Sequence, residues 1–297
     1  MTLKEMLYRR LAEDDELAQL LAKYQSHSAV FYQQAPASQD AGWGEAQYPR
    51  VDYTIDTMGD PARNVSQMLI LNIWCDTQAG GEPEPIERRI HELLHSAFAQ
   101  PDDDAPHCFA WTRTDAFEGA RGEGFNPNTY GVTMRFDILA FPILEISSPD
   151  PMGALAKWTK RAVPHAHVIG VDEIAEWLVP GAEHPVIYWR LTSRQNGQHF
   201  HFGMWFDVQI TGHVIATEEA GRAAVVDALG IQIPIAKFAM MENRSPFHFA
   251  TLRAAYGADY LRTGQMVLSG RYVIQPANND PLINHIYFNG RRVPTYG

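Results

Sequence analysis

The sequence predicts an α+β fold made of two similar units, each an antiparallel β-sheet with helices packed on one face. Three observations predict this fold: a long-period internal repeat, strands of alternating polarity that return as hairpins, and amphipathic helices between the hairpins. The repeat is the most informative of the three, because self-similarity at a fixed period indicates a chain built from copies of one unit.

The repeat is first seen in two strand pairs. One pair begins at Pro49 and returns from Met68, and the other begins at Pro185 and returns from Met204. Both are separated by the same offset, since 185 − 49 = 136 and 204 − 68 = 136. A shared offset over two strands favours duplication over a chance likeness between β-rich segments.

The same offset continues through a helix and a later strand. Ile90 aligns with Val226 (226 − 90 = 136), and Phe136 aligns with Tyr272 (272 − 136 = 136). Only the strand between these two blocks slips, by a few residues. Four blocks in the same order at one offset therefore predict an internal duplication.

Composition sets the class of protein. A length of 297 residues fits about two domains, and 45% hydrophobic with 20% charged residues is ordinary for a folded soluble chain. The sequence has no uninterrupted apolar run long enough to predict a membrane span. The first residues predict the start of a helix rather than the apolar core of a signal peptide.

Net charge and cysteine content indicate which class of partner and which redox compartment to expect. A net charge of −11 argues against a nucleic-acid-binding surface, which needs clustered Lys and Arg to displace counterions from phosphates. The two cysteines, Cys75 and Cys108, each lie in a predicted strand. We expect them to be small core residues rather than a disulfide, in a chain made in a reducing cytoplasm.

The elements of the first unit begin with a helix. Apolar residues at helical spacing predict one long helix or two short ones over residues 3–23, with an acidic break at Asp14 and Asp15. A short apolar strand is predicted over residues 29–33. Residues 35–47, rich in Pro, Gly, Ser and Gln, predict a loop.

A hairpin, a helix and a second hairpin complete the first unit. Residues 49–57 alternate apolar and polar, which predicts a strand with one face in water, and residues 67–76 are its returning partner. Pro85 opens a helix at the position where its missing N–H costs nothing. The apolar stripe of that helix contains Ile86, Ile90, Leu93, Leu94 and Phe98. The closing strands are predicted over residues 107–117 and 129–141.

Residues 142–151 contain three prolines and two serines and predict the boundary between the units. We expect a first unit over residues 1–145, a second over 146–275 and an extended tail over 276–297. The second unit should repeat the first, with added elements near its start. Its predicted elements are a helix at 152–161, a strand at 165–170, a short helix at 172–178, the hairpin, a helix at 218–229 and the closing strands.

Two His-x-His pairs suggest one enzymatic hypothesis. Residues two apart on a strand share a face, so His165 with His167, and His199 with His201, could each offer two imidazoles to a metal ion. A site of this kind would be completed by a residue such as His248, Glu183 or Asp207. Neither pair recurs in the first unit, and surface histidines are the competing interpretation.

Other catalytic signals are absent from the sequence. It contains no Gly-x-Ser-x-Gly elbow, no Gly-x-Gly-x-x-Gly and no phosphate-binding P-loop. From the residues alone we therefore expect a non-enzymatic protein without a cofactor, with a metal-dependent enzyme as the alternative.

The order of elements in the first unit is similar to that of a known family. The elements that support the resemblance are the amino-terminal helix, Ala29–Tyr32, a loop, Pro49–Asp56, Met68–Cys75, the Ile86–Phe98 helix and the closing strand Arg135–Leu139. They resemble the tail terminator or tail completion (head–tail joining) proteins of long-tailed bacteriophages. The likeness covers most of the first unit and reaches the second through the repeat. Family members are usually single units, whereas this chain has two.

The resemblance implies a structural virion protein that forms a ring, usually of six units, around a channel. Such a ring terminates the tail tube of the phage and joins it to the head or neck connector. Its partners would be further copies of itself, the tail tube protein and the connector protein, with assembly in the host cytoplasm. Two fused units could give a trimer or a hexamer. Another neck component of the same architecture is a further possibility.

An acidic lumen would let DNA pass through the ring without specific binding. Contacts with the neighbouring tube ring are expected from the loops between hairpin strands, which are free to reach a partner. The predicted tube-contact residues are Met58, Asp60, Arg63, Asn64, Arg194 and Asn196.

Overall fold

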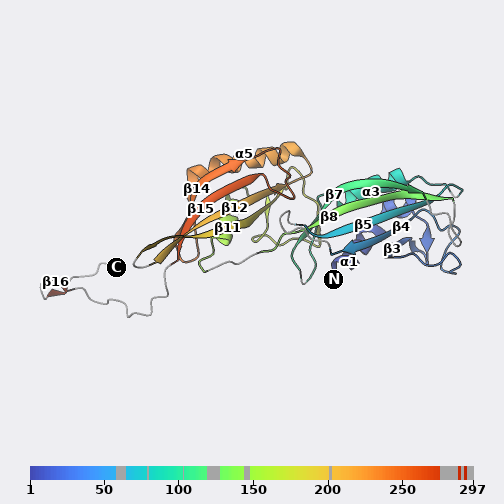
Figure 1. The fold of residues 1–297 in the computed structure, drawn as a ribbon, viewed down its shortest axis with the longest axis horizontal. Coiled ribbons are helices and arrows are strands. Elements are labelled where there is room, and N and C mark those ends of the chain that lie inside the picture. Colours follow the sequence, from blue (N-terminus) through green and yellow to red (C-terminus); the bar gives the residue numbers. More distant parts are fainter. Residues whose placement is uncertain are drawn as a thin grey trace.

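The computed structural model contains two sheet-and-helix units that follow one another along the long axis (Figure 1). It describes residues 1–57, 65–78, 80–102, 104–118, 128–143, 148–200 and 203–274, and the backbone of 287–288 and 291–292. Within these residues the predicted α+β class with two similar units is confirmed.

The first unit contains three helices and a mostly antiparallel sheet. Its helices are α1 (Leu3–Ala12), α2 (Asp15–Leu20) and α3 (Pro83–Leu94). Its strands are β1 (Lys23–Tyr24), β2 (His27–Ser28), β3 (Val30–Tyr32), β4 (Arg50–Asp56), β5 (Val65–Asp76), β6 (Phe98–Ala99), β7 (His107–Glu118) and β8 (Thr129–Ala140).

The second unit has two helices, α4 (Pro151–Ala162) and α5 (Glu219–Ala236). Its strands are β9 (His167–Val168), β10 (Trp177–Leu178), β11 (Val186–Phe200), β12 (Gly203–Ile215), β13 (Phe238–Met240), β14 (Pro246–Ala254) and β15 (Met266–Ile274). In the tail, β16 (Tyr287–Phe288) pairs with β17 (Arg291–Arg292).

The two sheets have equivalent strand orders. The first is β10-β6-β7-β8-β5-β4-β3 and the second is β13-β14-β15-β12-β11-β9. Each has one parallel pair at the same place, β3 with β4 and β9 with β11, and the remaining pairs are antiparallel. The sequence repeat is thus a repeat of topology, apart from β10, which has no counterpart in the second sheet.

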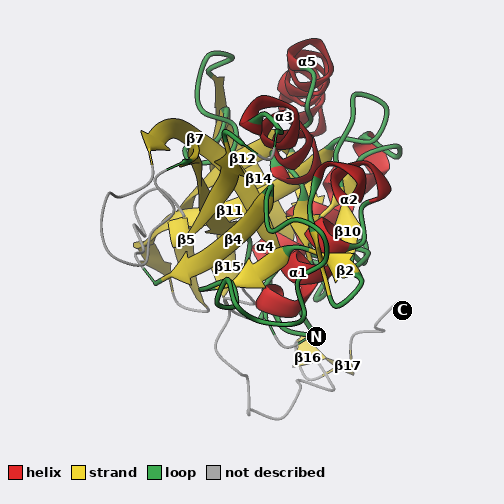
Figure 2. Ribbon diagram, turned by 90° about the vertical axis from the view of Figure 1, so that its right-hand side faces the viewer, coloured by secondary structure: helices red, strands yellow, loops and turns green. Residues whose placement is uncertain are grey.

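The helices cover one face of each sheet, and Figure 2 shows the helices of both units on the same side. Sequence chemistry fixes their ends. Thr2 and Glu5 form a capping box at α1. Asp150 accepts hydrogen bonds from the backbone N–H groups of Met152 and Gly153, with Pro151 at the first position of α4.

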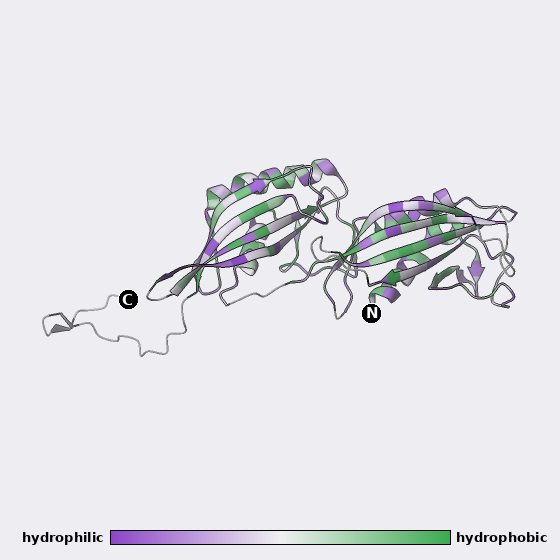
Figure 3. Ribbon diagram, in the orientation of Figure 1, coloured by the Kyte–Doolittle hydropathy of each residue, from purple (hydrophilic) through white to green (hydrophobic). Residues whose placement is uncertain are grey.

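Each unit has its own hydrophobic core between sheet and helices. Apolar and polar residues alternate along the long strands (Figure 3), so one face of each sheet is buried under helices. Leu71, Met134 and Ile90 belong to the first core, and Trp189, Leu268 and Leu229 belong to the second. Within the described residues, no helix has the length and apolar character to cross a membrane.

The predicted offset is wrong by one residue for β12 and by four residues for β11. Leu71 pairs with Met134, whereas Val208 pairs with Gly270, the residue aligned with Met134 (270 − 134 = 136). The structural equivalent of Leu71 is therefore Val208, at an offset of 208 − 71 = 137. A slip of one residue exchanges the two faces of a strand, so aligning Met68 with Met204 was wrong. At the same offset Thr211 is the equivalent of Trp74, and their partners Arg190 and Arg50 differ by 190 − 50 = 140, so aligning Pro49 with Pro185 was wrong as well.

Two predicted helical segments are strands. The expected helix at 172–178 is absent, and its last residues form β10, which pairs with β6 of the first sheet. Phe98 does not continue the stripe of α3, because the helix ends at Leu94 and Ser96 adopts a φ of 63° that turns the chain into β6. Helix α5 extends past its predicted end to Ala236.

Both cysteines are free and buried, as expected for core residues. Burial raises the pKa of the Cys75 thiol to about 11 and that of Cys108 well above its usual range. These shifts keep both groups as neutral thiols, which are poor nucleophiles.

Candidate functional site: the inter-unit joint and two outer ends

The first feature is the contact between the two units, which we call the joint. Its apolar part is a cluster with members from both units, including Phe98 and Phe141 before the boundary and Tyr188 after it. The ring centroids of Phe98 and Phe141 are 5.2 Å apart, and those of Phe141 and Tyr188 are 5.1 Å apart. Phe98 and Phe141 are fully buried. This burial makes the units one packed body at this point.

Strand β10 extends the joint along the edge of the first sheet. Leu178 pairs with Phe98 and Trp177 pairs with Ala99, so a segment of the second unit occupies the free edge of β6. The guanidinium of Arg10 lies 5.3 Å from the centre of the Trp177 ring. Covering an edge strand in this way removes a row of unpaired backbone groups.

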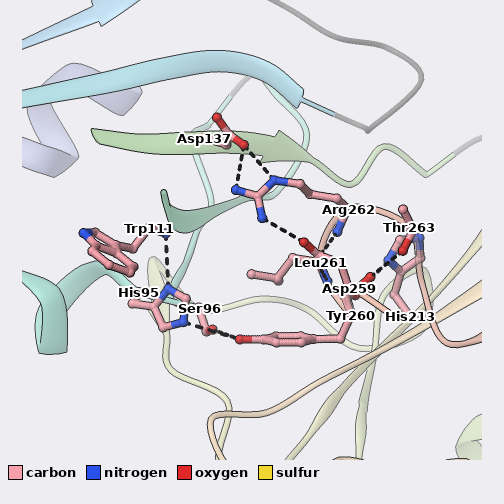
Figure 4. Close-up of polar contacts among 10 residues, drawn as sticks. All are labelled: His95, Ser96, Trp111, Asp137, His213, Asp259, Tyr260, Leu261, Arg262 and Thr263. Carbon is pink, nitrogen blue, oxygen red and sulfur yellow. Dashed lines mark hydrogen bonds and ion pairs between the residues drawn. The ribbon is translucent and has the colours of Figure 1, made fainter. Parts of the chain in front are cut away.

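A turn between β14 and β15 supplies the polar part of the joint (Figure 4). Arg262 of this turn binds Asp137 of β8 through Nε and Nη2, each at 2.7 Å, and binds Asp259 through Nη1 at 2.9 Å. The side chains of Arg262 and Asp137 are only 19% and 21% exposed. Both nitrogens reach the same oxygen, Asp137 Oδ2, and such a partly buried, charge-assisted contact is stronger than a neutral hydrogen bond.

Tyr260, from the same turn, reaches the end of α3. The backbone N–H of Trp111 donates to His95 Nδ1 at 3.2 Å, so the ring proton lies on Nε2, which faces the Tyr260 hydroxyl at 3.4 Å. That hydroxyl is 2.9 Å from Ser96 Oγ. Burial, with smaller effects from His91, Arg262 and Arg222, lowers the pKa of His95 to about 4.

A serine beside a histidine could suggest nucleophilic catalysis, but this geometry does not support it. Ser96 is fully buried, and the Tyr260 hydroxyl lies between it and His95. A nucleophilic serine needs direct contact with its base and access for a substrate. The hydrogen bonds among His95, Ser96 and Tyr260 are therefore interpreted as a contact that holds the two units together.

Behind the turn, His213 and Gly264 fix its conformation. His213 Nδ1 lies 3.0 Å from the carbonyl oxygen of Tyr260, and burial lowers its pKa to about 4. Gly264 has a φ of 76°, and a Cβ there would lie 2.5 Å from Thr211 Cγ2, so only glycine fits.

The second feature is the outer end of the second unit, at β13 and the end of α5, which we call the β13 edge. Four of the eleven large apolar side chains that are exposed among the described residues lie here within ten residues. They are Ile231 (63%), Ile235 (72%), Phe238 (43%) and Met240 (49%). Because β13 is the last strand of its sheet, one side of its backbone has no neighbouring strand in the described chain.

The third feature is the outer end of the first unit, where aromatic rings surround Arg50; we call it the Arg50 cluster. The guanidinium lies 4.7 Å from the ring centre of Tyr48, 5.8 Å from Trp43 and 6.0 Å from Trp74. Asp52, only 8% exposed, accepts a hydrogen bond from Trp74 Nε1 at 2.5 Å. Burial raises the pKa of Asp52.

Neither predicted histidine pair shows the shared strand face within the described residues: His165 lies in a turn before β9, and the partner of His199 is not described. The two pairs are also far from each other. His167 of β9 lies beside Val186 at the start of β11, whereas His199 lies near the other end of that strand. The separation of 199 − 186 = 13 residues corresponds to about 43 Å of strand. His165 and His199 are exposed, and His201 lies outside the described residues.

The residues suggested to complete a metal site do not assemble one. His248 and Asp207 both lie opposite Arg271, on neighbouring strands of the second sheet. Among the described residues, which include Glu183, no three His, Cys, Asp or Glu side chains lie close enough together to hold a metal ion. The structure thus provides no described site for the metal hypothesis.

The predicted tube-contact loops are only partly within the described chain. Met58, Asp60, Arg63 and Asn64 lie outside it. Arg194 and Asn196 were expected in a loop but lie in β11, paired with Val208 and Phe206 of β12. The hairpin is longer than predicted because polar residues on both strands continue the pairing beyond the core.

Comparison of the chain with family models, with characterised proteins and with solved structures found no match. The resemblance to tail terminators therefore remains a prediction, and function must be argued from the three features above.

Sequence reasoning missed all three features. The joint unites residues such as Ser96 and Tyr260 that are 164 positions apart, so no local motif contains them. One signal was available: the dipeptide Phe-Ala occurs at residues 98–99 and again at 238–239, directly after the helix of each unit.

Proposed function

We propose that this chain is a non-enzymatic structural protein of a phage or phage-like tail, which assembles into a ring, terminates the tail tube and joins it to the head or neck connector. The observation that supports self-assembly best is the β13 edge. Phe238 and Met240 are exposed there on an edge strand, on the face opposite the buried Ala239, and Ile231 and Ile235 are exposed at the adjoining helix end.

An apolar edge of this kind is unfavourable in a solitary protein. Soluble proteins usually protect an edge strand with charges, prolines or a covering segment, because it can pair with another chain. Exposed aromatic and aliphatic side chains on such an edge favour a protein partner. If the partner is another copy and the contact joins different surfaces, repetition closes a ring or extends a filament.

The specific role comes from the resemblance of the first unit to tail terminator proteins. A net charge of −11 agrees with a channel through which DNA passes without adhering, since acidic walls repel phosphates. The two covalently linked units fit a ring of three or six chains.

Electron microscopy of the purified protein, alone and with assembled tail tubes, tests the proposal. We expect rings of three or six chains with a central hole, and we expect these rings to cap one end of the tube. Single chains that neither form rings nor bind tube ends would contradict it. Stoichiometric zinc or iron in the purified protein would favour the competing enzyme hypothesis.

A further inference from the structure

The joint is a head-to-tail contact, because the two units use different surfaces to make it. The first unit contributes Phe98 of β6 and the end of β8, and the second contributes Val186 and Tyr188 at the start of β11. Figure 1 shows the units following one another along the long axis. Since the sheets are topologically equivalent, each unit also has the surface that its neighbour uses.

One unused surface is the β13 edge. Strand β13 occupies the place in its sheet that β6 occupies in the first, and both strands contain Phe-Ala. Ala99 and Ala239 are buried in the cores of their own units. Phe98 is fully buried by the joint, whereas Phe238 is 43% exposed. The β13 edge of the second unit is therefore the equivalent of the β6 edge of the first, but no described segment packs over it as β10 packs over β6.

The other unused surface is the Arg50 cluster. Arg50 pairs with Trp74 and Arg190 pairs with Thr211, so β4 and β11 are equivalent at an offset of 190 − 50 = 140. At that offset Tyr188, which enters the joint, corresponds to Tyr48 of the Arg50 cluster, since 188 − 48 = 140. The connection that carries β10 lies between β9 and β11. Its equivalent in the first unit, between β3 and β4, contains Trp43 and Tyr48, two of the rings around Arg50.

We infer that the Arg50 cluster of one chain docks on the β13 edge of a second copy of this chain, repeating between chains the contact that the joint makes within one. The inference rests on the proposed self-assembly and names its two surfaces. Because the contact joins unlike surfaces, each added copy leaves one free end of each kind, so the series closes only as a ring.

The charges of the two surfaces are complementary. Near the Arg50 cluster, Glu118 pairs across the sheet with Tyr130, and Glu82 and Glu84 add to the effect of burial in raising the pKa of Tyr130. Glu82, Glu84 and Glu118 are exposed. At the other end, Lys237 precedes β13 and is exposed, and Arg271 is exposed too, with part of its charge offset by Asp207 at 3.4 Å. Opposite charges at the two ends favour head-to-tail contact over contact between like ends.

Two variants that each block one end test this arrangement. Phe238→Asp places a charge on the β13 edge, and Glu82→Lys with Glu118→Lys reverses charge at the other end. Tyr8→Asp, at an exposed aromatic residue of α1 that lies beside Lys4 and Tyr53 and belongs to neither surface, is the matched control. Sedimentation velocity measures association of each protein, with circular dichroism to verify folding. We expect Phe238→Asp to weaken association about 30-fold, as loss of a central aromatic contact does, and the control to associate as the wild type does.

The decisive sample is an equimolar mixture of the two blocked variants. Each variant keeps one intact end, and the intact ends are complementary, so the mixture should form dimers of one copy each although neither variant associates alone. Wild-type association without dimers in the mixture would overturn the inference. Phe238→Asp that associates like the wild type would overturn it too, while leaving ring formation in place. A wild type that stays monomeric at all concentrations, and that also fails to form rings on tail tubes, would contradict the proposed function itself.

Discussion

The β6 and β13 edges carry the same Phe-Ala pair and differ in what covers them. At β6, a strand of the second unit and the Asp259–Thr263 turn bury Phe98 completely. At β13, Phe238 and Met240 are exposed in the described chain. In both strands the Phe-Ala sequence places the alanine in the core and the phenylalanine on the opposite face. Whether that phenylalanine stabilises the fold depends on the segment that packs over it.

The largest expected effect comes from removing the covered aromatic. Phe98→Ala should destabilise the protein by about 3–5 kcal/mol, because it leaves a cavity in the joint. Phe238→Ala should change the stability of the isolated chain by less than about 1 kcal/mol, because its side chain is already 43% exposed and leaves no enclosed cavity. Urea unfolding of both variants at low protein concentration measures the difference. Equal losses would refute the contrast between the two edges.

A second test removes the polar contact of the joint. Arg262→Ala leaves Asp137 and Asp259 without their guanidinium partner, at a cost of about 2–3 kcal/mol. Because the contact links the units, we also expect the unfolding transition to broaden or divide in calorimetry. Arg262→Lys keeps the charge without the two nitrogens that reach Asp137 and should fall between the wild type and Arg262→Ala. A single, unshifted transition in Arg262→Ala would show that the units do not depend on this contact.

The buried histidines predict a pH dependence of the joint. Burial lowers the pKa of His213 to about 4, below the ordinary value of 6.5, so in this interval the unfolded chain binds a proton that the folded chain does not. The free energy of unfolding should therefore fall as pH decreases from about 6.5 to about 4, by about 1.4 kcal/mol per pH unit for this group. His213→Asn should reduce the slope by that amount.

The pH interval in which His213 takes up its proton lies above the range in which Asp259, a carboxylate of the joint, does so. The pKa of Asp259 is lowered from 3.8: burial raises it, but hydrogen bonds and the charge of Arg262 outweigh burial, so its contribution is lost only at more acidic pH. Urea unfolding from pH 7 to pH 4 measures the slope. A slope that His213→Asn leaves unchanged would count against this assignment.

The smallest effect is expected at an exposed ion pair of the second unit. Lys157 and Glu242 are 3.3 Å apart, with side chains 59% and 75% exposed. Lys157→Ala should cost less than about 0.5 kcal/mol, since water screens such pairs. Thermal unfolding of Lys157→Ala and Arg262→Ala, measured side by side, compares the two losses of stability. Similar losses would mean that burial does not strengthen the Arg262 contact at the joint.

Much of the fold could be predicted from the sequence, because periodicity is local information. The repeat, both hairpins and the helices after them follow from spacing alone. The segment at 172–178 was predicted as a helix because its pairing partner, β6, lies far away in the sequence and leaves no local signal. The slips of one residue at β12 and four at β11 arose because few identities anchored those blocks, and register there is set by pairing between strands.

The candidate site was less predictable. The histidine pairs attracted attention through their spacing, yet the strands place His167 and His199 far apart. The joint depends on unlike residues such as Arg262 and Asp137, 125 positions apart, that no motif describes. Exposure of Phe238 is likewise a property of the assembled sheet, because a strand's position at the edge is not written in its own residues.

The central claim is that the exposed β13 edge makes the chain assemble with itself. Its most direct test is the native mass of the wild-type protein over a range of concentrations, measured by sedimentation velocity beside Phe238→Asp. The account predicts a defined oligomer of three or six wild-type chains and a monomer for the variant. Wild type and variant with the same mass, whether both monomeric or both assembled, would contradict it.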